Sequence, residues 1–291
     1  MGTVVHTGTA RRTKAAGALL TAALLCAGAV GCGSEKAGDK SADTPAMSPV
    51  AAVKAAAKNT EKLTSLSYRM SGRTPEEGRF SGEGAISFKP KAMRMTMRTL
   101  DQGDDVSLEM RFIGKTMYMG SDEFAPEMEG KRWIKLDVST LGKGGSGDRS
   151  ASSLSGQADK NPADESTFLS SSDNVKRVGK ETIDGVSTTH YRGTVTVDQM
   201  RASLKGEDAE TRERREKNFE QLDEMGIERV SMDMWIDGEH HTKRFRMRGK
   251  GDKGPLDNTV TFLSINKPVT VKAPPASETR DLADLSEGAQ G

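Results

Sequence analysis

Apolar and polar residues alternate with a period of two along most of this chain, and this pattern constrains the fold more than any other sequence feature. The apolar residues of each run share one face, at residues 66–70, 80–88, 93–97, 106–112, 117–119, 134–138, 175–181, 188–197, 230–236, 245–247 and 260–264. Consecutive short runs of this kind predict an antiparallel meander that is covered on one face and solvated on the other. Asp184-Gly185 is a turn signal typical of a hairpin. Residues 249–258 predict a polar turn.

A helix and a long loop are predicted beside these strands. Ser48 followed by Pro49 is a helix start, and the apolar stripe that follows extends to about Leu63. The Gly- and Ser-rich stretch 142–163 predicts a loop, which is longer than a simple connector needs to be. A short helix is expected at about residues 163–170.

Residues 198–225 predict a single further helix. Its centre, 207–217, is almost entirely charged, and apolar residues stand at both ends. This centre fits a solvated helix held by Glu–Arg pairs three and four residues apart. It also fits a lid or a helix that binds a partner, and both interpretations stay open.

Residues 1–31 predict a bacterial lipoprotein signal peptide. A positively charged start precedes an apolar stretch at 15–30 that is too short and too rich in Ala and Gly for a membrane span. Small residues directly precede Cys32. This pattern resembles the lipobox of bacterial lipoproteins, in which the cysteine is acylated and, after cleavage, becomes the first residue of the mature protein. Cys26 is the competing candidate, but the bulky Leu25 disfavours cleavage there. The alternative is a plain secretory signal with a buried cysteine.

Acylation of Cys32 is expected to hold the protein on the extracytoplasmic face of the cell membrane, because two or more acyl chains give stable anchoring. Residues 32–48 lack large apolar side chains before Met47 and predict a flexible tether. Loss of residues 1–31 leaves 40 basic and 42 acidic residues. Attraction to anionic headgroups is therefore not the expected means of attachment.

Composition and motifs exclude several functional classes. The formal net charge of +1 gives no basic excess for a nucleic-acid binder. Two cysteines are too few for a zinc cluster or a disulfide scaffold. The sequence lacks a Gly-x-Ser-x-Gly elbow and a phosphate loop, and no spacing of carboxylates marks a general acid–base pair. We therefore expect no enzyme activity, no catalytic residue and no cofactor.

The histidines do not predict a metal site. His240 and His241 adjoin Asp237 and Glu239, which are potential ligands. Adjacent residues of a strand point to opposite faces, so the two histidines cannot easily share an ion. His190 lies on an expected strand and is predicted to be a packed or surface residue.

Three segments carry a resemblance to a known family. They are residues 178–193, with Val-Gly-Lys-Glu-Thr-Ile-Asp-Gly, residues 234–238, with Met-Trp-Ile-Asp-Gly, and residues 266–275, with Asn-Lys-Pro-Val-Thr-Val-Lys-Ala-Pro-Pro. Together with Cys32, they resemble the actinobacterial LppX/LprA/LprF/LprG lipoproteins, which are related in fold to LolA and LolB. The resemblance covers roughly residues 50–276.

This resemblance implies an α+β fold. Its sheet would be antiparallel and strongly curved, an incomplete barrel, with helices packed on the concave side and a hydrophobic cavity for acyl chains between them. The lipid-binding domain would span residues 49–276, and a polar C-terminal tail would follow at 277–291. Some members of the family are implicated in moving lipids or glycolipids outward from the membrane.

The side chains on the predicted apolar faces are candidates for lining such a cavity. The chain has 15 methionines, and unbranched thioethers can repack around acyl chains of varying shape. The same methionines also fit an irregular core that holds no ligand, and this alternative stays open. The candidate lining residues are Tyr68, Met70, Ile86, Phe88, Met93, Met95, Met97, Leu108, Met110, Phe112, Met117, Met119, Met232, Met234 and Ile236.

The expected function is that of a membrane-anchored lipoprotein that binds or transfers lipids or acylated molecules. Its expected partners are the membrane, through acylated Cys32, and a lipid or glycolipid, with no nucleic acid. Two alternatives stay open. One is a cell-surface sensor or protein-interaction module on the same fold, with 142–163 and 207–217 as contact surfaces. The other is a structural lipoprotein with a filled core.

Overall fold

The computed structural model describes residues 47–75, 78–101, 107–138, 162–282 and 284. The predicted signal peptide, Cys32, nearly all of the tether and most of the predicted loop lie outside the described residues. In the described part of the chain, no helix has both the length and the apolar character that crossing a membrane requires.

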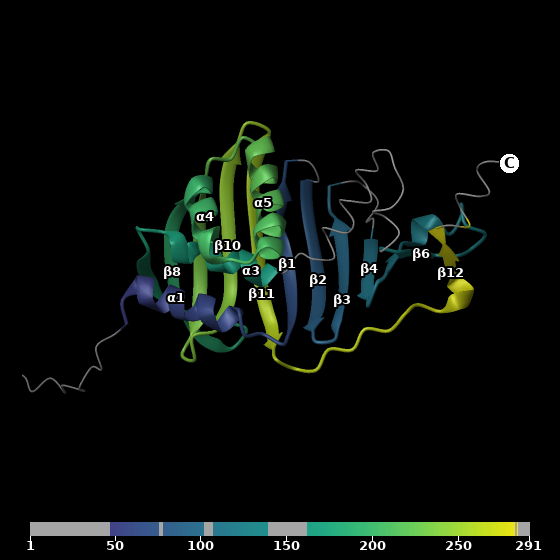
Figure 1. The fold of residues 1–291 in the computed structure, drawn as a ribbon, viewed down its shortest axis with the longest axis horizontal. Coiled ribbons are helices and arrows are strands. Elements are labelled where there is room, and N and C mark those ends of the chain that lie inside the picture. Colours follow the sequence, from purple (N-terminus) through teal and green to yellow (C-terminus); the bar gives the residue numbers. More distant parts are fainter. Residues whose placement is uncertain (1–46, 76–77, 102–106, 139–161, 283, 285–291) are drawn as a thin grey trace, which may run out of the picture. The chain divides into compact units, whose positions relative to one another are not determined.

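Twelve strands of the described residues form one open, curved sheet, which confirms the predicted α+β class (Figure 1). Their order is β12-β6-β5-β4-β3-β2-β1-β11-β10-β9-β8-β7, and all neighbours are antiparallel except β12 and β6. The strands are β1 (Ser65–Thr74), β2 (Gly78–Phe88), β3 (Lys91–Thr99), β4 (Ser107–Ile113), β5 (Thr116–Gly120), β6 (Trp133–Asp137), β7 (Lys176–Ile183), β8 (Val186–Thr196), β9 (Arg229–Asp237), β10 (Thr242–Gly251), β11 (Gly254–Ile265) and β12 (Thr279–Asp281).

The described helices are short. The α-helices are α1 (Pro49–Thr60), α3 (Pro162–Ser166), α4 (Val197–Ser203) and α5 (Ala209–Glu224), and the 3-10 helices are η1 (Asp122–Phe124), η2 (Thr167–Ser171), η3 (Leu204–Gly206) and η4 (Ala276–Glu278). Helix α1 begins as predicted, because the Oγ of Ser48 accepts a hydrogen bond from the backbone N–H of Ala51. It ends at Thr60, three residues before the predicted end.

The helices pack on one face of the sheet, which we call the inner face; it carries Tyr68, Met93 and Phe245. The opposite, outer face carries Arg69 and Arg244. In Figure 1, α1, α4 and α5 lie over the strands from β8 to β11, whereas no described helix lies over β2, β3 or β4. The inner face is therefore covered unevenly by the described helices.

Two hydrophobic cores form on the inner face. The first core joins the helices to the strands β8, β9 and β10, and includes Val53, Phe168, Leu169, Val195, Met200, Phe219, Leu222, Met232, Met234 and Ile236. The second core is built mainly from strand residues: Leu66, Tyr68, Ile86, Met93, Phe112, Met117, Leu136, Ala163, Phe245, Val260 and Phe262. At about 25 cal/mol per Å² of buried apolar surface, such cores are the main stabilising contribution in a chain of this kind.

The single helix predicted at 198–225 is wrong, because this segment forms two α-helices. Thr196 and Gln199 make a capping box that starts α4, which passes into η3 and ends at Gly206. Asp208 then caps α5 by accepting a hydrogen bond from the backbone N–H of Thr211. A second N-cap within the charged run therefore starts a new helix.

The polar turn predicted at 249–258 is also wrong. Strands β10 and β11 continue through this range, and Gly251 pairs with Gly254 across the tight turn between them. A Cβ at Gly251 would lie 2.0 Å from the carbonyl oxygen of Met225. The glycine here therefore reflects a close approach of two backbone segments, and the polar residues reflect a solvated outer face. Neither marks a loop.

The sheet also extends past residue 276, into the segment predicted as a polar tail. Strand β12 pairs in parallel with β6, and Thr279 lies opposite Trp133. Lys135 pairs with Asp281 at 3.0 Å. Three polar residues show no alternation, so their sequence alone does not predict this strand.

Candidate functional site

The predicted lining residues on β2 to β5 stand in rows across the strands of the inner face. Ile86 lies opposite Met93, Met93 opposite Phe112, and Phe112 opposite Met117, which lies opposite Leu136 on β6. Each of these five side chains is at most 7% exposed. The period-two pattern therefore places them on one buried, apolar surface.

A second row lies beside the first. Met95 lies opposite Met110, which lies opposite Met119, and a third, shorter row places Met97 opposite Leu108. Met95 and Met110 are buried, while the other three are half-buried. The three rows together form a surface in which flexible thioethers outnumber branched or aromatic side chains.

Tyr68 extends this surface onto β1. It lies opposite Gly84, and a Cβ at Gly84 would come within 2.4 Å of the tyrosine ring. Glycine therefore leaves the space that the ring occupies over β2. The Tyr68 hydroxyl donates to the Sδ of Met95 at 3.6 Å. Burial first, and the charge of Glu165 second, raise the pKa of the Tyr68 phenol, so the group is neutral near pH 7.

The structure places the remaining candidates in other positions. Met70 and Phe88 are half-buried and pack against the second core. Met232, Met234 and Ile236 belong to the first core, among the side chains of the helices. The predicted set is therefore divided between a surface on β2 to β5 and a core that the described helices cover.

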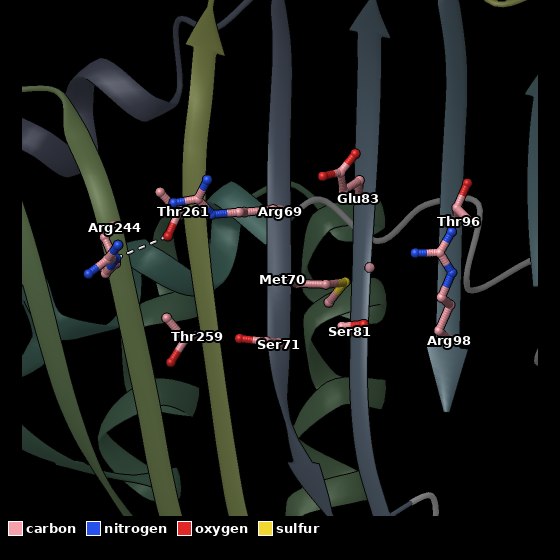
Figure 2. A pocket seen from close by; sticks show the side chains of 11 residues that line it. Arg69, Met70, Ser71, Ser81, Glu83, Thr96, Arg98, Arg244, Thr259 and Thr261 are labelled. Atoms are coloured by element: carbon pink, nitrogen blue, oxygen red, sulfur yellow. Dashed lines mark hydrogen bonds between the residues drawn. The ribbon is translucent and has the colours of Figure 1, made fainter. Parts of the chain in front are cut away.

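Among the grooves bounded by described residues, three are lined mostly by residues with polar side chains. One, of about 420 Å³, lies on the outer face over β1, β2, β3, β10 and β11 (Figure 2). The largest, of about 1370 Å³, is formed by β8, β9, β10 and residues next to α4 and α5. The third, of about 380 Å³, lies beside Trp133. These three grooves differ from the hydrophobic cavity that the family resemblance implies.

A buried polar cluster on the outer face was missed by the sequence analysis. The Nδ1 of His190 lies 2.8 Å from the carboxylate of Glu181, and its Nε2 lies 2.6 Å from that of Asp233. Arg192 and Arg248 also donate to Asp233, each at 2.6 Å. His190 is packed, which is one of the two positions predicted for it, and its side chain is only 5% exposed. The cluster satisfies its buried charges by pairing them.

Trp235 completes this cluster. Its ring stacks on His190 with 4.3 Å between centroids, and its Nε1 donates to Glu181 at 2.8 Å. The hydrogen bond from Trp235, and then that from His190, outweigh partial burial and hold the pKa of Glu181 below its ordinary value. The polar positions that alternate along β8 and β9 were the only sequence signal of this cluster, and they do not reveal which residues meet.

The segment around His240 and His241, for which no metal site is predicted, forms a turn. His240 has a φ of 60°, and it lies between the strands β9 and β10 instead of on one of them. Ligand atoms of Asp237, Glu239 and His241 lie within 4.8 Å of one another. The carboxylate of Asp237 accepts hydrogen bonds from the backbone N–H groups of Glu239 and His241. The turn itself therefore accounts for this cluster.

Two Streptomyces proteins are similar to the chain in sequence. The uncharacterized 31.2 kDa protein encoded between rplA and rplJ in Streptomyces griseus is 30% identical over 230 residues, which are 78% of this chain and 72% of that protein. A candidate lipoprotein of Streptomyces coelicolor is 27% identical over 228 residues, which are 76% of this chain and 66% of that protein. No family model matches the chain.

Two mycobacterial crystal structures are similar in fold. The lipoprotein LppX of Mycobacterium tuberculosis is 20% identical, with a TM-score of 0.46 over 77% of this chain and 98% of LppX. LprF of Mycobacterium bovis is 14% identical, with a TM-score of 0.47 over 78% of this chain and 96% of LprF.

Proposed function

Because this chain belongs to the same family as the 31.2 kDa protein of Streptomyces griseus, an actinobacterial family of LppX/LprF-like lipoproteins, we propose that it is a membrane-anchored lipid-binding lipoprotein. The family assignment agrees with the resemblance found in the sequence. In the proposal, acylated Cys32 anchors the protein on the extracytoplasmic face. The inner face of the sheet then binds the acyl chains of a lipid or glycolipid.

The observation that carries the proposal is the apolar inner face of β2 to β5. Its rows centre on Met93, Met95, Met110 and Met117, and no described helix lies over β2, β3 or β4 in Figure 1. Aliphatic acyl chains match such a surface because they bring no polar group that needs a partner. Thioethers adapt to chains of different length and branching by changing rotamer.

The proposed mechanism is passive. Transfer of an acyl chain from water to an apolar surface yields about 0.8 kcal/mol for each buried methylene group. A chain of many methylene groups is therefore held firmly without any charged contact. Release requires an apolar acceptor, such as a second membrane or another carrier, because return to water would cost the same free energy.

A second candidate function is a sensor or interaction module that carries no transported ligand. It is favoured by the burial of the inner face, since the residues of the first row are at most 7% exposed. The two functions differ in one measurable property, which is the lipid content of the purified protein.

The anchor is tested by replacing the cysteine. We expect Cys32→Ser to be released into the medium, because no thiol remains for acylation, whereas Cys26→Ser stays in the membrane fraction. Immunoblots of medium and membranes from cells expressing each full chain measure this. Retention of Cys32→Ser in the membrane, or release of Cys26→Ser, would contradict the assignment of Cys32.

Lipid binding is tested by a charge placed on the inner face. The full chain is purified from native membranes, extracted with organic solvent and analysed by mass spectrometry. We expect Met97→Glu to carry several-fold less lipid than the unmodified chain, because a carboxylate cannot be buried against an acyl chain. The half-buried position should tolerate the change.

Ala92→Glu is the matched control for Met97→Glu. Ala92 lies on the same strand but on the outer face, since it alternates with Met93. This variant should keep its lipid. If the unmodified chain carries no lipid beyond its own acylated cysteine, or if both variants lose lipid equally, the sensor function replaces lipid binding.

A further inference from the structure

The outer face of the sheet carries a polar groove of about 420 Å³ on the side opposite the helices. Figure 2 shows its side chains in front of the sheet, over the strands from β10 to β3, with the helices behind. The proposed acyl-chain surface lies on the other face, so this groove needs a separate explanation.

Strand register explains why the groove is hollow. Thr259, Ser71 and Ser81 lie directly opposite one another on β11, β1 and β2. This row ends at Arg98 on β3 and at Arg246 on β10. Three adjacent short side chains therefore form a floor between two long ones. Each hydroxyl can both donate and accept a hydrogen bond.

A second row borders this floor. Arg244, Thr261, Arg69, Glu83 and Thr96 follow one another across the strands from β10 to β3. The row brings two further guanidinium groups and two further hydroxyls to the groove. Among the described residues that line the groove, Glu83 is the only acidic one. Three arginines among the lining residues thus face one carboxylate.

Two of these arginines form no ion pair within the part of the chain that the structure describes, although the carboxylate of Glu181 interacts with Arg244 over a longer distance. Arg69 forms an ion pair with Asp184 at 2.7 Å. Arg98, in contrast, is exposed and makes no ion pair or hydrogen bond within the described part of the chain. Arg244 donates to the hydroxyl of Thr261 at 3.0 Å and forms no ion pair with a described carboxylate.

Arg244 is also fixed in position. Its guanidinium lies 5.8 Å from the ring centroid of Trp235, in a cation–π contact. Trp235 in turn is held by its stacking on His190 and its hydrogen bond to Glu181. The buried cluster therefore holds one arginine of the groove before any ligand arrives, which lowers the entropic cost of binding.

We propose that this groove binds a phosphate ester of a polyol, either as a lipid headgroup or as a soluble molecule. Arg98 and Arg244 contact the phosphate group or groups, since guanidinium groups form strong charge-assisted hydrogen bonds with phosphate oxygens. The hydroxyl floor of Ser71, Ser81 and Thr259 binds the hydroxyls of the polyol. The four strand spacings between β10 and β3 span about 19 Å, so the ligand is extended.

The proposal is tested by calorimetric titration of the full chain in a nonionic detergent. Glycerol 3-phosphate is the soluble probe, and glycerol is its uncharged match. Lipid discs containing phosphatidylglycerol, compared with discs of phosphatidylcholine alone, present the same chemistry as a headgroup. We expect saturable binding of at least one phosphate probe and none of glycerol.

Two groove variants and one matched control locate the site. For each phosphate probe we expect Arg98→Gln or Arg244→Gln to weaken binding about tenfold or more, because a single phosphate contacts the arginine at one end of the groove and the substitution removes that charge-assisted hydrogen bond. Arg94→Gln should leave the affinity unchanged, since Arg94 is exposed on the same face of β3 but does not line the groove. All three variants should unfold at the same urea concentration as the unmodified chain.

The outcomes separate the possible sources. Binding of glycerol 3-phosphate, lost in the groove variants only, supports a soluble ligand. Binding of phosphatidylglycerol discs alone, with the same dependence, supports a lipid headgroup. Equal weakening by Arg94→Gln shows attraction to the whole face and overturns the proposal, as does the absence of binding to every probe. Neither result depends on whether the inner face holds acyl chains.

Discussion

At the scale of single residues, Asp233 is a buried charge with three hydrogen-bonding partners. It is 1% exposed on β9 and accepts hydrogen bonds from Arg192, His190 and Arg248. Burial alone would raise the pKa of its carboxyl, but the three hydrogen bonds outweigh burial and hold that pKa below its ordinary value. The ionised carboxylate therefore stabilises the fold at neutral pH.

Replacing this carboxylate should be costly. We expect Asp233→Asn to lower the free energy of unfolding by about 3 kcal/mol, because it leaves buried cations without their partner. Urea unfolding of the full chain, followed by tryptophan fluorescence, measures the change. The control Asp257→Asn breaks a more exposed pair with Arg246 and should cost less than about 1 kcal/mol. Equal costs would contradict a special role of Asp233.

The lowered pKa of Asp233 also predicts a pH dependence. Its stabilising contribution is complete above the unfolded-state pKa of about 4. The contribution is lost as the pH falls from there through the lower folded-state pKa. Repeating the unfolding measurement between neutral and acidic pH should show a smaller acid loss in Asp233→Asn than in the unmodified chain.

The sequence predicted the inner-face residues better than this cluster. Met93 and Met95 repeat with the strand period, so their common face follows from the sequence alone. His190 and Asp233 stand 43 residues apart and meet only because β8 pairs with β9 in one register. A single sequence does not contain that register, so it does not predict the buried pair.

At the scale of elements, α5 is held to the fold by its few apolar residues. Phe219 is fully buried in the first core, with its ring 5.3 Å from that of Phe168. Arg201 of α4 forms an ion pair with Glu216 at 2.7 Å, which joins the two helices. The charged segment is thus partly packed against the protein, and Arg215 within it is only 8% exposed.

Phe219 should therefore dominate the attachment of α5. We expect Phe219→Ala to lower the free energy of unfolding by about 3–5 kcal/mol, because it leaves a cavity in the first core. Lys217→Ala, on an exposed position of the same helix, should change it by less than about 0.5 kcal/mol. If Phe219→Ala is as mild as its control in urea unfolding, α5 is not fixed by the first core.

The errors in predicting these elements have local causes. The prediction of one helix over the charged run neglects a stop signal at Gly206 and an N-cap at Asp208, which starts α5. Strand β12 escaped prediction because it exists only through its pairing with β6. Helix starts marked by a clear cap, such as Ser48 with Pro49, were predicted to the residue.

At the scale of the whole sheet, two meanders share one surface. One comprises β1 to β6 and the other β7 to β11, and they join where β1 pairs with β11. The sequence predicted both meanders but not this junction, because the paired residues, such as Met70 and Val260, lie far apart along the chain. The junction makes the inner face continuous, and it also forms the floor of the outer groove.

Covalent capture of a lipid tests the central claim most directly. The full chain is incubated with a phospholipid that carries a photoreactive group on its acyl chain, irradiated, and digested for mass spectrometry. We predict that the label falls on the inner-face residues Met93, Met95, Met110 and Met117. A label confined to outer-face residues, or no label on the chain, would contradict the account of this protein as a lipid-binding lipoprotein.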